Sequence, residues 1–312
     1  MSTAWSLVFM GTPEIAASTL EALIQGPDKV VGIVTQPARP AGRGQHHVPS
    51  PVRKVADRHG ISVVEPEKIR DPAFFETLRG WRPHIIVVVA YGRILPSPIL
   101  ELAPHGCLNV HYSLLPKYRG AAPAAWTIIH GDKVAGVTTM RLVAKMDAGP
   151  IYLQEPVSVA ADDTTASLQA KLTPVGARLV LETIRRLKEG SINAVQQDEE
   201  AATLAPMIKK EDGLIDWHLP AIAIERRVRG FHPWPSAYSH RHNKLLKIYR
   251  ARVIDASEPA QPGEVVRADG SGLWVATGEG ILSLEEVQLE GKRRLSGIEF
   301  IRGARVAEGE RL

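Results

Sequence analysis

A nearly unbroken apolar run, HIIVVVAYG at residues 84–92, constrains the fold of this chain more than any other feature. A strand with such a run is covered on both faces, because neither side carries the polar residues that water would contact. Two further runs rich in Val and Ile, at 5–11 and 29–35, are bounded by turn residues. These runs predict the buried strands of one sheet in the first half of the chain.

Segments with helical features separate these runs. Residues 12–26 begin with Thr12, a candidate N-cap, and a proline follows it at a position that suits the first helical turn. Residues 50–60 begin in the same way, with Ser50 and a proline. Strands that alternate with helices are typical of βαβ units. We therefore expect an α/β fold with a Rossmann-like, doubly wound and mostly parallel sheet.

Three later segments complete the predicted N-terminal domain. Residues 135–143 and 149–159 are expected to form a pair of strands. Residues 162–190 are expected to form a long helix that Pro174 breaks or kinks. The end of this helix sets the boundary of an N-terminal domain at 1–190.

The composition changes after this helix. Residues 191–208 are polar and lack periodicity, which indicates a linker. Residues 209–312 contain a short amphipathic helix at 220–230, followed by short strand-like pieces that glycines and acidic turns separate. Several short strands at this spacing are typical of a small β-barrel, so we expect an OB-like C-terminal domain. A length of 312 residues suits this two-domain plan.

The composition bounds the class of protein. The apolar fraction of 44% and the charged fraction of 23% are those of an ordinary soluble globular protein. Cys107 is the only cysteine, so no internal disulfide can form and a reducing compartment is expected. The first residues do not resemble a signal peptide, and no stretch approaches the about 18 apolar residues of a membrane span. We expect a cytoplasmic protein with no membrane partner.

Basic residues concentrate in two regions, one in each half. Residues 36–58 contain five Lys and Arg against one acid, and residues 209–257 contain ten against five. Such clusters are typical of a surface that binds a polyanion. Scattered surface charge is the alternative, and charge alone gives the two readings equal weight.

The stretch LNVHYSLLPKYRGAAP at 108–123 carries the strongest chemical signal. Asn109 and His111 end a strand-like segment and point to the same face, because residues two apart on a strand do so. In open α/β sheets, ligands bind beyond the carboxyl ends of the strands. An amide donor beside an imidazole suits an oxyanion at an acyl carbon. An ordinary turn with a satisfied histidine is the alternative for this motif.

A third candidate is Asp147, which lies in a loop bounded by glycine and proline. A carboxylate there would orient the histidine or accept a proton, as a general base and its orienting group do. The alternative is an aspartate that serves only as a turn former.

Two motifs together resemble the signature of the folate-dependent formyltransferase superfamily: NVHYSLLPKYRGAAP (109–123) and MDAGPI (146–151). VVVAYGRILP (87–96) resembles the folate-pocket segment of the same superfamily. The basic segment 35–52 resembles an insertion loop, and 213–238 the start of the C-terminal domain, in the branch that formylates initiator methionyl-tRNA.

The resemblance implies a transfer of the formyl group from 10-formyltetrahydrofolate to the α-amine of methionine on initiator tRNA, without a metal, by a monomeric enzyme. It implies a catalytic set of Asn109, His111 and Asp147. The expected folate contacts come from the two apolar motif segments: Val89, Ala90, Tyr91, Gly92, Ile94, Leu95, Ser113, Leu114, Leu115 and Pro116. The expected tRNA contacts are basic residues of both charged regions: Arg39, Arg43, His46, His47, Lys244, Lys247 and Arg250.

Two other functions stay open from the sequence. A formyltransferase of the same fold that acts on an amino sugar or a glycinamide ribonucleotide is the nearest, although a small substrate does not need the basic insertion at 35–52. A non-catalytic nucleic-acid-binding protein is the second, and the three polar candidates argue against it. Phe231 and Trp234 are expected in the core, and Cys107 as a buried, inert thiol.

Overall fold

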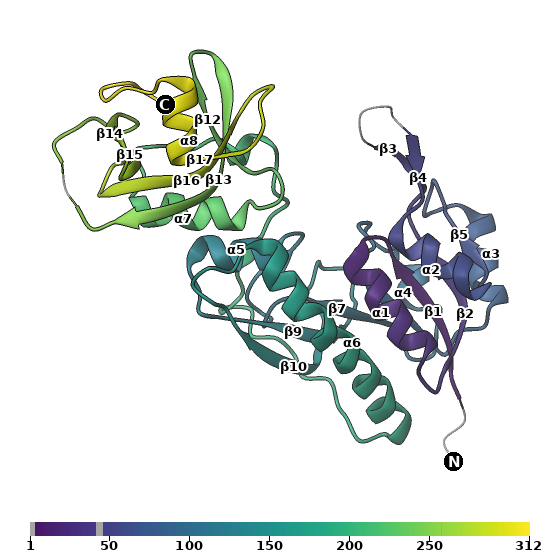
Figure 1. Cartoon of the computed structure of the whole chain (residues 1–312). Coiled ribbons are helices and arrows are strands. Elements are labelled where there is room, and N and C mark those ends of the chain that lie inside the picture. Colours follow the sequence, from purple (N-terminus) through teal and green to yellow (C-terminus); the bar gives the residue numbers. More distant parts are fainter. Residues whose placement is uncertain (1–3, 42–45, 257) are drawn as a thin grey trace. The chain divides into compact units, whose positions relative to one another are not determined.

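The chain forms two compact units in a computed structural model, which describes residues 4–41, 46–256 and 258–312 (Figure 1). The N-terminal unit comprises Met1–Pro123, Val134–Ser158 and Gln169–Pro206. The C-terminal unit comprises Ala124–Lys133, Val159–Leu168 and Met207–Leu312. Contacts therefore divide the chain near residue 206, but they group two short earlier segments with the C-terminal unit.

A seven-stranded sheet forms the centre of the N-terminal unit, in the order β10-β9-β7-β6-β1-β2-β5. Its strands are β1 (Ser6–Gly11), β2 (Lys29–Val34), β5 (Val63–Val64), β6 (Ile85–Val89), β7 (Cys107–His111), β9 (Val134–Arg141) and β10 (Ile151–Ser158). The five strands from β5 to β7 are parallel, whereas β9 pairs antiparallel with both β7 and β10. The predicted α/β fold with a mostly parallel sheet is confirmed.

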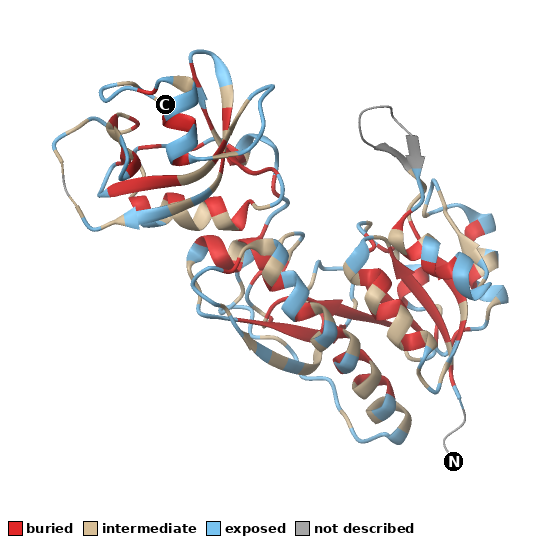
Figure 2. Ribbon diagram, in the orientation of Figure 1, coloured by how far each residue is buried: buried red, intermediate tan, exposed pale blue. Residues whose placement is uncertain are grey.

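Helices cover both faces of this sheet, and its central strands are buried, whereas the edge strands β5 and β10 have no fully buried residue (Figure 2). One face packs against α3 (Pro72–Gly80) and α4 (Ser97–Leu100), whose Phe74, Leu78, Ile99 and Leu100 join one apolar cluster with Val8, Met10, Ile86, Val88 and Cys107. The other face packs against α1 (Glu14–Ile24) and α6 (Thr165–Glu189). The apolar run at 84–92 thus forms β6, which is buried on both sides as predicted.

The remaining elements before residue 206 are short. They are β3 (Arg39–Ala41), β4 (His46–Val48), α2 (Pro51–His59), β8 (Arg119–Gly120), α5 (Pro123–His130) and β11 (Leu204–Ala205). Most of α5 belongs to the C-terminal unit. β3 and β4 form an antiparallel pair, and β11 pairs in parallel with β8.

The start of α1 differs from the prediction. Thr12 does not cap this helix; the N-cap position falls on Pro13, which has no side chain that can accept a hydrogen bond. The Thr12 hydroxyl instead donates to the carbonyl of Tyr91 at 3.3 Å and accepts from the backbone N–H of Gln36 at 3.4 Å. It therefore links three strand ends, a contact that local sequence cannot reveal.

Two other helix predictions have opposite outcomes. Ser50 caps α2 as predicted, because its hydroxyl accepts from the backbone N–H of Arg53 at 3.0 Å. We expected a break or a kink at Pro174, and the break is excluded, since α6 continues through this residue from Thr165 to Glu189.

The C-terminal unit has an antiparallel sheet in the order β12-β13-β16-β15-β14, and β17 pairs with β16. Its elements are η1 (Glu211–Gly213), α7 (Ala221–Gly230), β12 (Ala237–Arg241), β13 (Lys244–Ile254), β14 (Val265–Asp269), β15 (Gly272–Ala276), β16 (Ile281–Leu289), β17 (Leu295–Ser296) and α8 (Gly297–Ala304). α7 and α8 pack on this sheet around one apolar core. Phe231 is buried as expected, but Trp234 is 60% exposed, so its assignment to the core is wrong.

In the part of the chain that the structure describes, none of the helices combines the length and the apolar character needed to cross a membrane.

A stack of aromatic rings lies at the amino end of the sheet. Trp5 precedes β1, and its ring stacks on His105 at 4.1 Å and on His84 at 5.9 Å between ring centroids. Ser6 donates its backbone N–H to Nδ1 of His84 at 2.9 Å. Burial lowers the pKa of His105, and the nearby His84 and Arg141 lower it further.

The stack predicts a loss of stability in mild acid. A lowered pKa in the folded state means that the unfolded chain binds the His105 proton more tightly, so protonation favours unfolding. We expect the free energy of unfolding to fall from about pH 7.5 to about pH 5.5, across the ordinary histidine pKa of about 6.5. Denaturant titrations at several pH values measure this, and His105→Gln should reduce the fall. An identical pH dependence in wild type and variant would contradict the assignment to His105.

Candidate active site

β7 presents Asn109 and His111 on one face near its carboxyl end. Both are buried, at 8% and 6% exposure. Alternation along the strand places them on the same side as Cys107, which belongs to the cluster under α3 and α4. Val110 lies on the opposite face, where Gly176 of α6 approaches it. The apolar surroundings of β7 therefore enclose two polar side chains.

Both ring nitrogens of His111 have polar neighbours. Nε2 lies 2.8 Å from the carbonyl oxygen of Tyr118. A carbonyl oxygen only accepts hydrogen bonds, so Nε2 carries the proton in this bond. Nδ1 lies 3.7 Å from Oδ2 of Asp147, which is within ion-pair distance. Nδ1 is therefore the nitrogen left for exchange with a substrate.

Asp147 reaches His111 from the loop between β9 and β10. Its Oδ2 accepts the backbone N–H of Gly120 at 2.8 Å, and its backbone has a left-handed φ of 48°. The same loop requires glycine at 149, because a Cβ there would lie 1.7 Å from the carbonyl oxygen of Arg141. This tight path brings the carboxylate to the end of β7.

Asn109 differs from its neighbours because its side-chain amide makes no hydrogen bond to any described residue. The described side-chain atoms that are fully sealed without a partner do not include this amide, so it keeps some contact with solvent. Its position beside His111 makes it a candidate donor for a ligand.

The turn that follows β7 is held by internal hydrogen bonds. Thr138 Oγ1 donates to the Ser113 carbonyl at 2.6 Å and accepts from the Leu115 backbone N–H at 3.2 Å. The Ser113 hydroxyl donates to the Lys117 carbonyl at 2.6 Å. Ser113 and Leu115 are buried, while Leu114 and Pro116 are half-buried. Of these four predicted folate contacts, Leu114 and Pro116 therefore remain the more accessible.

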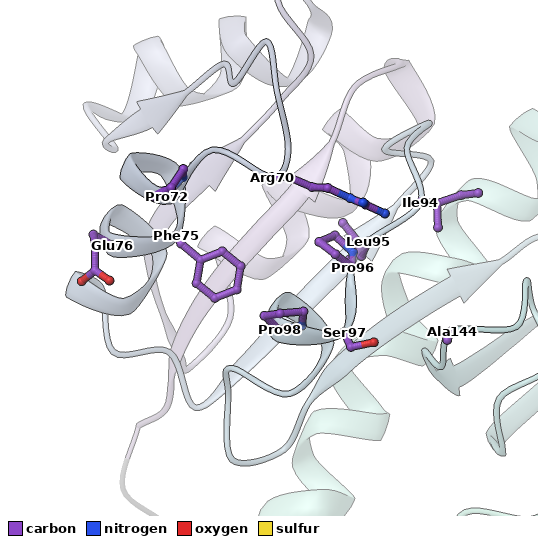
Figure 3. A pocket seen from close by; sticks show the side chains of 10 residues that line it. All are labelled: Arg70, Pro72, Phe75, Glu76, Ile94, Leu95, Pro96, Ser97, Pro98 and Ala144. Carbon is purple, nitrogen blue, oxygen red and sulfur yellow. The ribbon is translucent and has the colours of Figure 1, made fainter.

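The other predicted folate segment borders a cavity of about 750 Å³ (Figure 3). Ile94 and Leu95 line this cavity with Pro96, Phe75 and Arg70, and Ala144 of the loop between β9 and β10 also lines it. The cavity does not include Asn109, His111 or Asp147.

The residues of this segment alternate in exposure. Ala90, Gly92 and Ile94 are exposed, while Val89, Tyr91 and Leu95 are buried. The Tyr91 hydroxyl is sealed without a hydrogen-bond partner, and burial raises the pKa of this phenol. Tyr91 is thus a core residue whose side chain is turned away from solvent.

The predicted tRNA contacts fall into two groups. Arg43 lies outside the described residues, as do the side chains of Arg39, His46 and His47. On β13, Lys244 is exposed, Lys247 is half-buried and Arg250 is 70% exposed. Arg250 pairs with Glu285 at 2.9 Å, and Arg252 pairs with the same carboxylate at 3.1 Å. The neighbouring acid therefore offsets part of the positive charge that the sequence suggested for this strand.

The sequence did not indicate a role for two residues near the Asp147 loop, Arg119 and Gln197. Arg119 is only 5% exposed although it lies in the quoted motif, and Gln197 lies in the stretch expected to be a linker. The Gln197 amide bonds to the backbone carbonyls of Asp147 and Gly149. Nothing in the local sequence of Gln197 indicates this contact, because the partners are about fifty residues away in the chain.

Cys107 starts the strand that carries Asn109 and His111, but it is not placed for nucleophilic chemistry. It is 1% exposed, and its thiol donates to the Ile99 carbonyl at 3.5 Å. Burial raises the pKa of this thiol to about 12. Among the described residues, no group of three His, Cys, Asp or Glu side chains gathers as a metal site would require.

We expect Cys107 to resist thiol reagents in the native protein, because the reactive thiolate is nearly absent and the sulfur is sealed. Labelling with Ellman's reagent should be slow at neutral pH and complete after unfolding in guanidinium chloride, which serves as the control. Rapid labelling of the native protein at neutral pH would contradict this burial.

Comparison with known proteins matches both units. The family model "Formyl transferase" matches residues 5–184, and the model "Formyl transferase, C-terminal domain" matches residues 207–305. The methionyl-tRNA formyltransferase of Desulfotalea psychrophila is 48% identical over 96% of this chain and 93% of its own length. That of Citrifermentans bemidjiense is 47% identical over 98% of this chain and 96% of its own length.

A solved structure agrees in fold. The N-formyltransferase of Helicobacter canadensis, in complex with folinic acid and dTDP-3-aminofucose, matches with a TM-score of 0.67 at 16% identity. The match covers 90% of this chain and 99% of that one.

Proposed function

The chain belongs to the formyl transferase family, in the branch of the methionyl-tRNA formyltransferases, and we propose that Asn109, His111 and Asp147 carry its chemistry. The enzyme formylates the amino group of methionyl-tRNA, giving N-formylmethionyl-tRNA for translation initiation. Relatives with this substrate align over nearly the whole chain, so an amino sugar or a glycinamide ribonucleotide is not the preferred substrate. The unpartnered Asn109 amide beside the His111–Asp147 pair is the observation that carries the catalytic assignment.

Asn109 supplies an oxyanion donor in this proposal. The methionine amine attacks the formyl carbon of 10-formyltetrahydrofolate, and the carbonyl oxygen gains negative charge in the tetrahedral intermediate. The Asn109 N–H donates to this oxygen, which satisfies an amide that otherwise has no described partner. Collapse of the intermediate breaks the bond to N10 of the folate and leaves the formyl group on the amine.

His111 and Asp147 take part in the proton transfers of this reaction. The attacking amine loses one proton and the leaving folate nitrogen gains one. Because the Tyr118 carbonyl occupies Nε2, the exchange runs through Nδ1 of His111, which faces the Asp147 carboxylate. When Nδ1 carries this proton, it provides a second donor to the oxyanion. The residues at hand suffice for these steps without a metal.

The folate co-substrate is proposed to bind along the two predicted segments. Ala90, Gly92 and Ile94 are exposed, and Ile94 lines the 750 Å³ cavity. Phe75 and the prolines of this cavity suit an aromatic group, and Arg70 offers a cation to an anionic tail. Val89, Leu95 and Ser113 act as buried supports in this arrangement.

The tRNA is proposed to contact the basic insertion and the C-terminal domain. The antiparallel C-terminal sheet is consistent with an OB-like barrel, a fold whose sheet face binds nucleic acids. Lys244 and Lys247 lie on β13 of this sheet and make no ion pair with a described residue. The exposed indole of Trp234 adds a surface on which a base can stack. A cytoplasmic, monomeric enzyme with domains at 1–190 and 209–312 stays our prediction.

Asn109→Ala tests the oxyanion donor. Loss of one such donor typically lowers kcat about 10²–10³-fold, while the KM of each substrate should change little, because the bond forms in the transition state. Steady-state formylation of charged initiator tRNA measures both. Asn193→Ala, at an exposed asparagine, is the matched control. An Asn109→Ala enzyme with wild-type kcat would reject the proposed role.

Arg43→Ala tests the insertion loop, whose Arg43 we expect to enter the tRNA site. The variant should raise the KM for tRNA about tenfold or more, since a phosphate or base contact of this kind is worth roughly 1–3 kcal/mol. The KM for 10-formyltetrahydrofolate should stay within about twofold. Arg185→Ala, which removes an exposed arginine from α6, is the control. Equal increases in both KM values would count against this role.

A further inference from the structure

The side chain of Gln197 connects two parts of the site through four hydrogen bonds. Its Nε2 donates to the carbonyl oxygens of Asp147, at 2.8 Å, and Gly149, at 2.7 Å. Its Oε1 accepts from Nε and Nη2 of Arg119, at 3.0 and 2.8 Å. Both hydrogens and both lone pairs of one amide are therefore used.

The orientation of this amide follows from its partners. The two carbonyls can only accept, and the guanidinium of Arg119 can only donate. A rotated amide would place its N–H groups against the guanidinium and its oxygen against two carbonyls. A glutamine in this orientation satisfies both sides, whereas a glutamate would keep the Arg119 contacts and repel the carbonyls of Asp147 and Gly149.

Arg119 is the hydrogen-bond donor to the oxygen of the Gln197 amide. Its guanidinium is buried at 5% exposure and also binds Glu199, with two N–O distances of 3.1 Å. Lys145 binds the same carboxylate at 2.6 Å. A buried guanidinium is costly unless it is paired and hydrogen-bonded, so Glu199 and Gln197 fix its position.

The segment around Gln197 is anchored to the strand β8 as well. The Thr203 carbonyl accepts the backbone N–H of Arg119 at 2.8 Å, and its hydroxyl accepts that of Tyr118 at 2.9 Å. β11 then pairs in parallel with β8. The segment 197–205 is thus fastened to residues that contact both His111 and the Asp147 carboxylate.

The Asp147 loop needs such support. Asp147 adopts the left-handed φ of 48°, which non-glycine residues hold only when their surroundings impose it. A change in this backbone would move the carboxylate away from Nδ1 of His111. The Gly120 N–H donates a hydrogen bond to the carboxylate, and Gln197 Nε2 donates to the backbone carbonyls of Asp147 and Gly149.

We propose that Gln197 is a positioning residue for formyl transfer, which keeps the Asp147 carboxylate at His111, and that Arg119 and Glu199 hold Gln197 in place. The proposal rests on the proposed catalytic role of Asp147. It assigns to the stretch between the two predicted domains a direct part in the geometry of the active site.

Gln197→Glu tests this role, with Gln196→Glu as its matched control. Both variants make the same chemical change at adjacent positions, but Gln196 is exposed and has no described hydrogen-bond partner for its side chain. We expect Gln197→Glu to lower kcat about 10²-fold with both KM values within about twofold, and Gln196→Glu to match wild type. A kcat within twofold of wild type for Gln197→Glu would overturn the proposal.

A double variant separates positioning from general damage to the fold. If Gln197 acts through the carboxylate, Gln197→Glu should cost less than about twofold in an Asp147→Asn background, measured under single-turnover conditions. A loss as large as in wild type would show a purely structural role. If Gln197→Glu does not fold, Glu199→Gln supplies the same comparison, because it loosens Arg119 from the exposed side, and an unchanged kcat would overturn the proposal.

These results stay separate from the fate of the proposed function. Should Asp147→Asn alone keep wild-type kcat, the catalytic assignment of Asp147 fails. Should Asp147→Asn lose activity while Gln197→Glu does not, the catalytic assignment stands and the positioning role of Gln197 fails.

Discussion

A buried strand that carries an amide and an imidazole must find polar partners for both, and the rest of the site is arranged around this need of β7. Desolvation of an unpaired polar group costs about 1–3 kcal/mol, so such side chains are kept where other segments compensate for them. His111 donates a hydrogen bond to the Tyr118 carbonyl and faces the Asp147 carboxylate. The Asn109 amide has no described partner, and in the proposed mechanism it donates to the substrate oxygen.

The compensation for His111 comes from loops that are themselves restrained. Tyr118 belongs to the segment that β11 and Thr203 hold, and Asp147 belongs to a loop with no room for a side chain at Gly149. The Gly120 N–H joins the two segments by bonding the Asp147 carboxylate. Because each of these contacts restricts the next, the distance between imidazole and carboxylate is set by backbone packing rather than by flexible side chains.

Gln197 is a similar case, because it lies in residues 191–208, whose sequence shows no periodicity and no motif. A polar, aperiodic segment between two domains is usually regarded as a tether. Here the Gln197 amide accepts hydrogen bonds from a buried guanidinium and donates hydrogen bonds to two loop carbonyls. Polar composition is therefore a poor guide to function where the polar groups are buried against one another.

The sequence alone determined the class of the fold, and it also supplied the residues that we propose as catalytic. Apolar runs such as 84–92 favour strands covered on both faces, and the spacing of Asn109 and His111 places both on one side of such a strand. Local signals also fixed the Ser50 cap, because its partner is three residues away.

Only the tertiary structure decided which distant groups meet. It moved the Thr12 hydroxyl from a helix cap to a contact with Tyr91, exposed Trp234, carried α6 through Pro174, and brought Gln197 to the Asp147 loop. Periodicity and capping depend on neighbours along the chain, which a sequence displays. Contacts between residues fifty or more positions apart depend on how the strands and loops pack in space, and no local pattern records them.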